Sequence, residues 1–130
     1  MSIPIDPPDR LDFLLYIIHI WNMSRIRRTS VFAKWLADLR DGRAKFRISK
    51  RIGRLTKGNL GDTKPVGEGI SEMRIDYGPG YRVYYIERIA RDIGEEIIIL
   101  LCGGDKTSQD SDIEEAKRLA RNLPEGLTEE

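Results

Sequence analysis

The chain has 130 residues, with a hydrophobic content of 40% and a charged content of 33%. These values are typical of one soluble globular domain with a small core, and they exclude an intrinsically disordered chain. Cys102 is the single cysteine and His19 the single histidine. An internal disulfide is therefore excluded, and a metal site with cysteine or histidine ligands is not expected. Any catalysis must use Lys, Arg, Tyr and carboxylate side chains, and we expect no cofactor.

The net charge of +1 hides a strong separation of charge along the chain. Residues 24–64 contain 13 Lys and Arg against three Asp, a balance of +10. Residues 65–130 contain 8 Lys and Arg against 15 Asp and Glu, a balance of −7. This separation predicts a face that binds a polyanion and another surface for a second partner. The simpler explanation is that exposed helices carry charge, but so large an excess of one sign repels itself.

Residues 1–22 form an N-terminal extension that differs from the rest of the chain. Its segment "LDFLLYIIHIW" is 11 residues long and almost entirely apolar. It is too short to span a bilayer, and it lacks the basic flank and cleavage site of a signal peptide. The extension is either an extra helix or the result of an alternative start, because Met23 precedes a pattern that is complete by itself. We expect a domain over residues 23–124, a tail over residues 125–130, no membrane association and a cytoplasmic location.

Two short helices follow a polar extended segment, "SRIRRTS", which is not expected at the centre of a sheet. Thr29 or Ser30 can cap the first helix, and Asp41 can cap the second, which Gly58 ends. The inward residues of the two helices are Phe32, Trp35, Leu36 and Leu39, then Ala44, Ile48, Ile52 and Leu55. The outward basic residues of the second helix are Arg43, Lys45, Arg47, Lys50, Arg51, Arg54 and Lys57. The pattern predicts an αα-hairpin with a basic outer face.

The stretch "ISEMRIDYGPGYRVYY" predicts a β-hairpin with one apolar and one polar face. If the Gly-Pro-Gly segment is a three-residue loop, Tyr77 pairs with Tyr81, and Asp76 pairs with Arg82. In that register the polar face holds Glu72, Arg74, Asp76, Arg82 and Tyr84. We therefore expect Arg82 on an exposed face, where its replacement costs little stability.

The stretch "EIIILLC" is almost continuously apolar and predicts a buried central strand. It ends in "GGDKTSQ", where two glycines leave the backbone open and Lys106 projects from the end of the strand. A last helix from about Asp110 has an apolar stripe that runs to Leu123. The order of elements predicts an α+β fold, in which the N-terminal αα-hairpin packs on a small antiparallel sheet with a C-terminal helix.

The runs "FAKWLADLRD", "ISKRIGRLTKGNLGDTKPVGEGISEMRIDYGPGYRVYY" and "LLCGGDKTSQDSDIEEA" resemble the addiction-module killer proteins of the RelE/ParE superfamily. They are most similar to the HigB-like branch of type II toxins. The resemblance covers roughly Arg25 to Leu123, excludes residues 1–22, and depends most on "GPGYRVYY" combined with "GGDKTSQ". It implies a RelE-like fold, close to that of the microbial RNases.

The resemblance also implies a function, a ribosome-dependent mRNA endonuclease (an mRNA interferase) that needs no metal and inhibits translation. It implies a cognate helix-turn-helix antitoxin, contact with ribosome and mRNA, and operator DNA bound only through the toxin–antitoxin complex. Arg82 matches the arginine of the family's "GYR" motif, Arg74 the basic residue on the preceding strand, and Lys106 the basic residue after the last strand. Such cations would stabilise the phosphorane formed when the 2′-OH of RNA attacks.

One part of the family pattern is missing. RNA-cutting members often place a tyrosine or histidine in or near the C-terminal helix for proton transfer, and "SQDSDIEEA" has neither. Glu72 is the candidate here, with Asp105 and Tyr84 as alternatives. The basic outer face would hold ribosomal RNA through its phosphates. The residues expected to do so are Arg47, Lys50, Arg51, Arg54, Lys57 and Lys64.

Three functions stay open at this point. The chain is an mRNA endonuclease, a ParE-like inhibitor of DNA gyrase that needs no nuclease site, or an inactive homologue that only binds its antitoxin. A purely structural explanation of the site also exists. In that case Arg82 forms a surface cross-strand pair with Asp76, and Lys106 is a solvated loop residue.

Overall fold

A computed structural model describes residues 25–90 and 94–123 of the chain. In chain order its elements are β1 (Ile26–Arg28), α2 (Ser30–Asp38), α3 (Gly42–Leu55), β2 (Thr63–Gly67), β3 (Ile70–Ile75), β4 (Tyr81–Ala90), β5 (Glu95–Gly104), the 3₁₀ turn η1 (Lys106–Ser108) and α4 (Gln109–Arg121). The α+β class is as predicted. The expected extension over residues 1–22 and tail over residues 125–130 lie outside the described residues.

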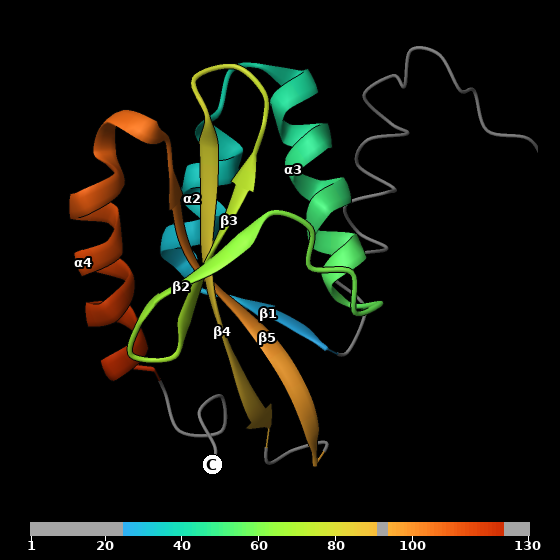
Figure 1. The fold of residues 1–130 in the computed structure, drawn as a ribbon, viewed down its shortest axis with the longest axis vertical. Coiled ribbons are helices and arrows are strands. Elements are labelled where there is room, and N and C mark those ends of the chain that lie inside the picture. The colour runs from blue at the N-terminus through green and yellow to red at the C-terminus, as the bar shows by residue number, and fades with distance from the viewer. Residues whose placement is uncertain (1–24, 91–93, 124–130) are drawn as a thin grey trace, which may run out of the picture.

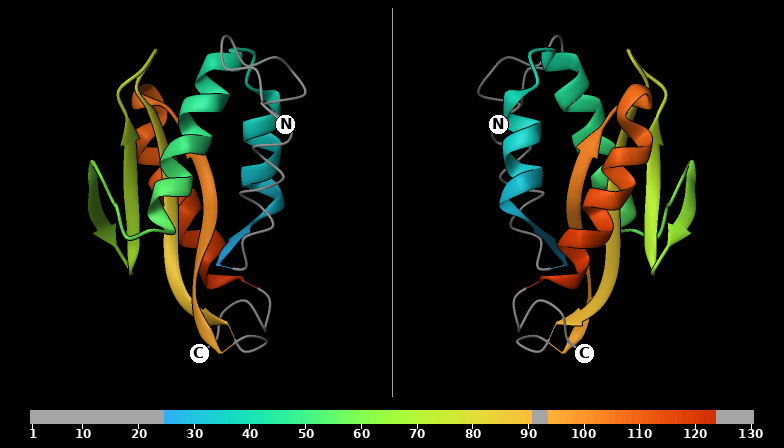
Figure 2. Two further views of the ribbon diagram at one scale, coloured as in Figure 1. Left: turned by 90° about the vertical axis from the view of Figure 1, so that its right-hand side faces the viewer. Right: turned by 90° about the vertical axis from the view of Figure 1, so that its left-hand side faces the viewer.

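The five strands form one mixed sheet in the order β1-β5-β4-β3-β2, with β1 and β2 at opposite edges (Figure 2). The prediction of an antiparallel sheet was wrong for one pair, because β1 runs parallel to β5. Ile26 holds β1 there, since its side chain is 3% exposed. Directly after β1, the Thr29 backbone N–H donates to the Leu100 carbonyl at 3.0 Å. The polar β1 is an edge strand, in agreement with its sequence.

Helices cover both faces of the sheet (Figure 1). The first core, under α2 and α3, is built by Ile26, Phe32, Leu36, Ile48, Ile52, Leu55, Met73, Ile75, Val83, Tyr85, Ile98 and Leu100. The second core, under α4, is built by Ile70, Tyr84, Ile86, Ala90, Ile97, Ile99, Leu101, Cys102, Ala116 and Ala120. The second core contradicts the prediction of an exposed polar face on β3 and β4. Tyr84 is fully buried there, because α4 packs over it.

The two N-terminal helices begin at the predicted caps. The Thr29 hydroxyl accepts from the Phe32 N–H at 3.0 Å, and the Asp41 carboxylate accepts from the Arg43 N–H at 2.9 Å. Gly58, with a φ of +81°, ends the second helix, as predicted. The apolar positions at helical spacing were also assigned correctly, since the inward residues of α3 are buried in the first core.

The predicted register of the β3–β4 hairpin was wrong. Arg74, and not Asp76, lies opposite Arg82, and Ile75 lies opposite Tyr81. The turn therefore covers residues 76–80, which is longer than the three-residue loop expected. Because the register differs by two residues, each side chain keeps the face assigned to it.

Tyr77 gives the physical reason for the longer turn. Its hydroxyl donates to Asp41 Oδ2 at 3.0 Å, and the Arg47 guanidinium lies 4.5 Å from the centre of its ring. Tyr77 thus contacts the N-terminal part of α3 and takes no part in strand pairing. Hairpin prediction from sequence considers only neighbouring residues, so it could not predict a contact between segments that are far apart in the chain.

Two further features of the sheet differ from the prediction. The connector "GNLGDTKPVGEG" contains β2, whose pairing with β3 is irregular between Pro65 and Gly67. Proline and glycine weaken the strand signal in a sequence, which explains why β2 was missed. The middle place in the sheet belongs to β4, while the apolar β5 lies between β4 and β1.

The glycines at the end of β5 allow close packing on both faces of the sheet. A Cβ atom at Gly103 would overlap the Trp35 ring on one face. A Cβ atom at Gly104 would overlap the Asp112 carboxylate on the other. The interpretation that these glycines leave an open backbone was wrong, because each is the contact point for a helix.

We expect Gly103→Ala to lower the free energy of unfolding by about 1–3 kcal/mol, the usual cost of overpacking a core. The Trp35 ring has little room to move, because it packs against Phe32 and Tyr81 at 5.7 and 6.2 Å between ring centres. Gly42→Ala is the matched control, since a Cβ atom there meets nothing within 4 Å. Urea denaturation measures both variants, and equal midpoints would contradict the packing argument.

Candidate functional site

Arg82 lies near the start of β4, directly after the 76–80 turn, and its side chain is 10% exposed. Its backbone lies opposite Arg74 on one side and Gly104 on the other. Its Nη1 donates to the Gly80 carbonyl at 2.9 Å. The expectation that Arg82 stands on an exposed polar face was therefore wrong, because its guanidinium lies between the Gly80 carbonyl and the buried Glu72 of β3.

Glu72 is the buried partner of Arg82. It is fully buried, and its Oε2 lies 3.5 Å from Arg82 Nε. The same oxygen accepts from the Tyr84 hydroxyl at 2.9 Å and from Gln109 Nε2 at 2.8 Å. Burial raises the pKa of Tyr84, and the hydrogen bond to Glu72 raises it further. We call these four residues the Glu72 network.

The Glu72 network is incomplete in its hydrogen bonding. Glu72 Oε1 and Arg82 Nε make no hydrogen bond to any described residue. Because one oxygen of the buried Glu72 carboxylate has no hydrogen-bond donor, its negative charge depends on the nearby Arg82 guanidinium for stabilisation. Because Glu72 has no exposed surface, it can hold Arg82 in place, but it does not reach a molecule at the surface.

Lys106 and Arg82 come together at Gly80. A Cβ atom placed on Gly80 would lie 3.4 Å from Arg82 Nη1 and 3.5 Å from Lys106 Cβ. Lys106 is exposed and begins η1, which Asp105 caps by accepting from the Thr107 N–H at 2.8 Å. The Thr107 hydroxyl lowers the pKa of Asp105, and the charge of Arg82 lowers it further. The structure thus brings the predicted Arg82 and Lys106 to one place.

Arg74, the third predicted cation, is engaged elsewhere. Its guanidinium binds Asp62, with Nη2 at 2.8 Å and Nε at 3.2 Å from Oδ1. This contact raises the pKa of Arg74. Arg74 is thus opposite Arg82 in register, but its charge is paired with a residue that precedes β2.

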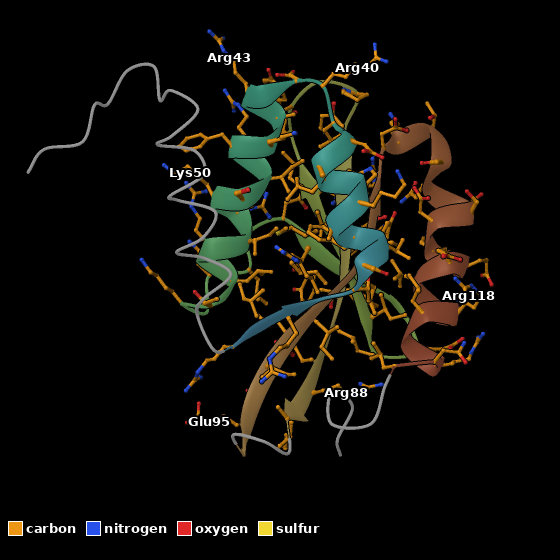
Figure 3. The ribbon with its side chains drawn as sticks, turned by 180° about the vertical axis from the view of Figure 1, so that it is seen from behind. Arg40, Arg43, Lys50, Arg88, Glu95 and Arg118 are labelled. Carbon is orange, nitrogen blue, oxygen red and sulfur yellow. The ribbon has the colours of Figure 1, made fainter. Side chains whose placement is uncertain are left out.

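The predicted RNA-binding residues divide into two groups. Arg47, Lys50, Arg51 and Arg54 line one hollow beside α3, whereas Lys57 and Lys64 do not line it. Lys50 projects outward from α3, as does Arg43 near the start of the helix (Figure 3). No carboxylate of the described chain, residues 25–90 and 94–123, forms an ion pair with Arg47, Lys50 or Arg54.

Arg51 differs from its neighbours on α3. Its Nη1 donates to the Arg74 carbonyl at 2.6 Å and its Nη2 to the Leu60 carbonyl at 3.3 Å. Burial lowers the pKa of Arg51, and the adjacent charge of Arg54 acts in the same direction. Arg51 therefore joins α3 to β3, a structural role that its position in a basic run did not indicate.

Sequence reasoning missed two members of the site. Gln109 was predicted to lie in a loop. It is instead the first residue of α4, and its side-chain amide donates a hydrogen bond to Glu72. Tyr77 was assigned to strand pairing, although it joins the turn to α3. The one available signal for Gln109 was a polar amide directly before an amphipathic helix, which is too common to single it out.

Over residues 25–90 and 94–123, no three His, Cys, Asp or Glu side chains gather closely enough to hold a metal ion. Over the same residues, no helix combines the length and apolar character that crossing a bilayer requires.

We expect Arg82→Ala to lower the free energy of unfolding by about 3–5 kcal/mol, because it leaves the Glu72 carboxylate buried without its cation. Arg74→Ala removes the same side chain from the opposite strand but only breaks an exposed pair, so its effect should be much smaller. Urea denaturation compares the two variants. Equal losses of stability would show that the Glu72–Arg82 contact is not a stabilising buried pair.

At alkaline pH, the free energy of unfolding should depend on Cys102. Its Sγ lies 3.5 Å from the Asp112 carbonyl oxygen. Burial raises the pKa of this thiol from 9.0 to about 12, with help from the charges of Asp112 and Glu115. Between these values the folded state keeps a proton that the unfolded state loses. The free energy of unfolding should therefore fall as the pH rises from about 9 to about 12, by at most about 1.4 kcal/mol per pH unit. Cys102→Ala should reduce this slope in urea titrations, and an unchanged slope would contradict the assignment.

A comparison with known proteins places the chain in a family. No protein-family model matches it. An uncharacterized protein of Haemophilus influenzae is 50% identical to it over 99 residues, which cover 76% of this chain and 95% of the relative. Such identity over nearly the whole of the relative implies common ancestry and a common fold. The chain therefore belongs to the same protein family as this Haemophilus influenzae protein.

Proposed function

We propose that this protein is the toxin of a type II toxin–antitoxin module, a HigB-like member of the RelE/ParE superfamily. In this proposal it is a ribosome-dependent mRNA endonuclease that needs no metal and inhibits translation. The observation that carries the proposal is the meeting of Arg82 and Lys106 at Gly80, beside the 76–80 turn. The sheet covered by two helices on one face and one on the other is compatible with the RelE-like fold.

The chemistry requires positive charge at the phosphate that is cut. Attack by the 2′-OH of RNA builds negative charge on a pentacoordinate phosphorus, and fixed cations stabilise that charge. Lys106 offers an exposed ammonium, and the Arg82 guanidinium is held by Gly80 and Glu72. Because Arg82 is mostly enclosed by protein, its charge is weakly screened. Glu72 is assigned here to positioning Arg82 and not to proton transfer.

The outer face of α3 supplies the second part of the proposal. Its sequence, "GRAKFRISKRIGRL", has no acidic residue. Phosphates of ribosomal RNA would replace the missing counter-charges, so binding should weaken steeply as salt rises. The same charge would attract a helix-turn-helix antitoxin through an acidic or extended segment. Operator DNA would then be bound only through the complex, in the cytoplasm.

A second candidate follows from the burial of Arg82. A guanidinium that is 10% exposed and lies 3.5 Å from a fully buried carboxylate is also what a purely structural pair would show. A ParE-like inhibitor of DNA gyrase needs no nuclease site, and an inactive homologue that only binds its antitoxin needs none either. Substitution of Lys106 separates these functions, because only the nuclease needs the charge of this exposed side chain.

Lys106→Ala is therefore the sharpest test. We expect cleavage of ribosome-bound mRNA to fall by about 10²–10³-fold, the usual loss for one charge-stabilising donor. The fold should be unchanged, since the side chain is exposed. Lys34→Ala is the control, a lysine of α2 with a side chain that is 79% exposed. Both are expressed inducibly without antitoxin, and growth and primer extension on translating ribosomes are measured.

Each outcome points to one function. Full cleavage and growth arrest by Lys106→Ala would remove Lys106 from the mechanism and end the nuclease proposal in this form. Accumulation of cleaved DNA by the parent, with intact mRNA, would favour the gyrase inhibitor. A parent that neither arrests growth nor cuts mRNA would be the inactive homologue.

A further inference from the structure

The most strongly charged recess of the described chain lies between α3 and the end of β3. It is a hollow of about 430 Å³, lined by Phe46, Arg47, Lys50, Arg51, Arg54, Ile75 and Asp76. Four of these side chains are cations and one is an anion, which gives the lining a net charge of +3. Small-molecule sites have volumes of roughly 300–1,000 Å³, and the hollow falls in that range. Its lining is therefore suited to a small anion that carries more than one negative charge.

Two arginines of the hollow are held in place by the fold. The guanidinium carbon of Arg47 lies 4.5 Å from the centre of the Tyr77 ring, and the Tyr77 hydroxyl is bonded to Asp41. Arg51 donates to two backbone carbonyls, which use only part of its five N–H donors. A guanidinium over an aromatic ring also keeps its N–H groups available at its edge. Guanidinium groups that are already positioned lose little entropy when they bind an oxyanion.

Arg54 adds a cation whose charge is not compensated nearby. Burial lowers the pKa of Arg51, and the charge of Arg54 lowers it further, so the two guanidinium groups repel each other. Within residues 25–90 and 94–123, no carboxylate forms an ion pair with Arg54 or with Arg47, and both residues are exposed. An anion bound between these arginines would remove the repulsion and supply the missing counter-charge.

We propose that this hollow binds the phosphate group of a phosphorylated compound, with Arg47 and Arg54 as ligands and Arg51 as the fixed cation beside them. The N–H groups of a guanidinium match two oxygens of a phosphate at once. A phosphate monoester carries a charge of about −1.5 to −2 near neutral pH, so it compensates the lining better than a single carboxylate does. The hollow is also larger than one phosphate and leaves room for the group attached to it.

The hollow is separate from the candidate site at Arg82. Its residue Ile75 belongs to the first core, under α2 and α3. Arg82 instead contacts Glu72, which bonds to Tyr84 of the second core on the other face of the sheet. The proposal therefore does not rest on the proposed nuclease function. Two sources of phosphate fit the same chemistry, a free phosphorylated compound and the backbone of an RNA.

The test is isothermal titration calorimetry of the full chain with inorganic phosphate and with pyrophosphate, at constant ionic strength. We expect saturable binding of both anions. Arg54→Ala should weaken pyrophosphate binding by about 10–150-fold, the usual loss for one hydrogen bond between charged groups. Arg54→Lys keeps the charge without the paired N–H groups and should restore only part of the affinity. Arg43→Ala is the matched control, because it removes an equal charge from α3 outside the hollow, and its effect should be much smaller.

Three results would overturn the proposal. The first is the lack of saturable binding of either anion by the parent. The second is an equal loss of affinity in Arg54→Ala and Arg43→Ala, which would reduce binding to general charge attraction. The third is an oligoglutamate peptide that depends on Arg54 and displaces pyrophosphate at lower concentration than AMP or RNA does, which would indicate a site for an acidic protein segment. Circular-dichroism melts establish that each variant is folded.

Competition identifies the source of the phosphate. Displacement of pyrophosphate by AMP but not by duplex RNA would indicate a free phosphorylated compound, and displacement by duplex RNA would indicate an RNA backbone. Displacement by neither would overturn the proposal, because the hollow would then admit only a small inorganic ion. If the parent cuts ribosome-bound mRNA but binds neither phosphate nor pyrophosphate, this proposal fails alone. If the parent cuts nothing but binds pyrophosphate through Arg54, the phosphate site remains and the nuclease proposal fails.

Discussion

The contact between Glu72 and Arg82 is the constraint on which the site depends. The carboxylate is fully buried, and it accepts from Tyr84 and Gln109 while it lies 3.5 Å from the Arg82 guanidinium. One residue of β3 thereby joins β4 to the first residue of α4. Because a buried carboxylate is tolerated only with such partners, the start of α4 and the adjoining η1 are set relative to β4. The same contact places Lys106 next to Gly80, so the geometry of the candidate site follows from a carboxylate, Glu72, that has no exposed surface.

Sequence patterns predicted the fold wherever the deciding interactions are local. The caps at Thr29 and Asp41 and the inward face of α3 depend on residues within one or two helical turns. The hairpin register was wrong because Tyr77 bonds to Asp41, 36 residues away. The buried state of Arg82 was missed for a similar reason. A strand with alternating polarity indicates an exposed face, and only the packing of α4 turned that face into a second core.

Charged residues were the hardest part of the site to assign from sequence. Arg51 and Arg54 look alike in the basic run and both line the hollow, yet only Arg51 donates to two backbone carbonyls there. Arg74 was predicted as a cation of the site, but its charge is paired with Asp62. Whether a cation is free for a ligand depends on where distant carbonyls and carboxylates lie in the fold. The sequence therefore indicated that α3 is basic without separating its structural arginine from its exposed ones.

The absence of any carboxylate within α3 affects the stability of the folded chain and therefore its lifetime in the cell. Its positive charges repel one another, and cations in the first turn also oppose the helix dipole. Any polyanion that covers this helix therefore stabilises the folded state as well as occupying its surface, by simple mass action. An acidic partner would act as a folding partner for this chain, and its removal would return the chain to a less stable, more easily degraded form. The lifetime of the protein would then be linked to the supply of that partner through the electrostatics of one helix.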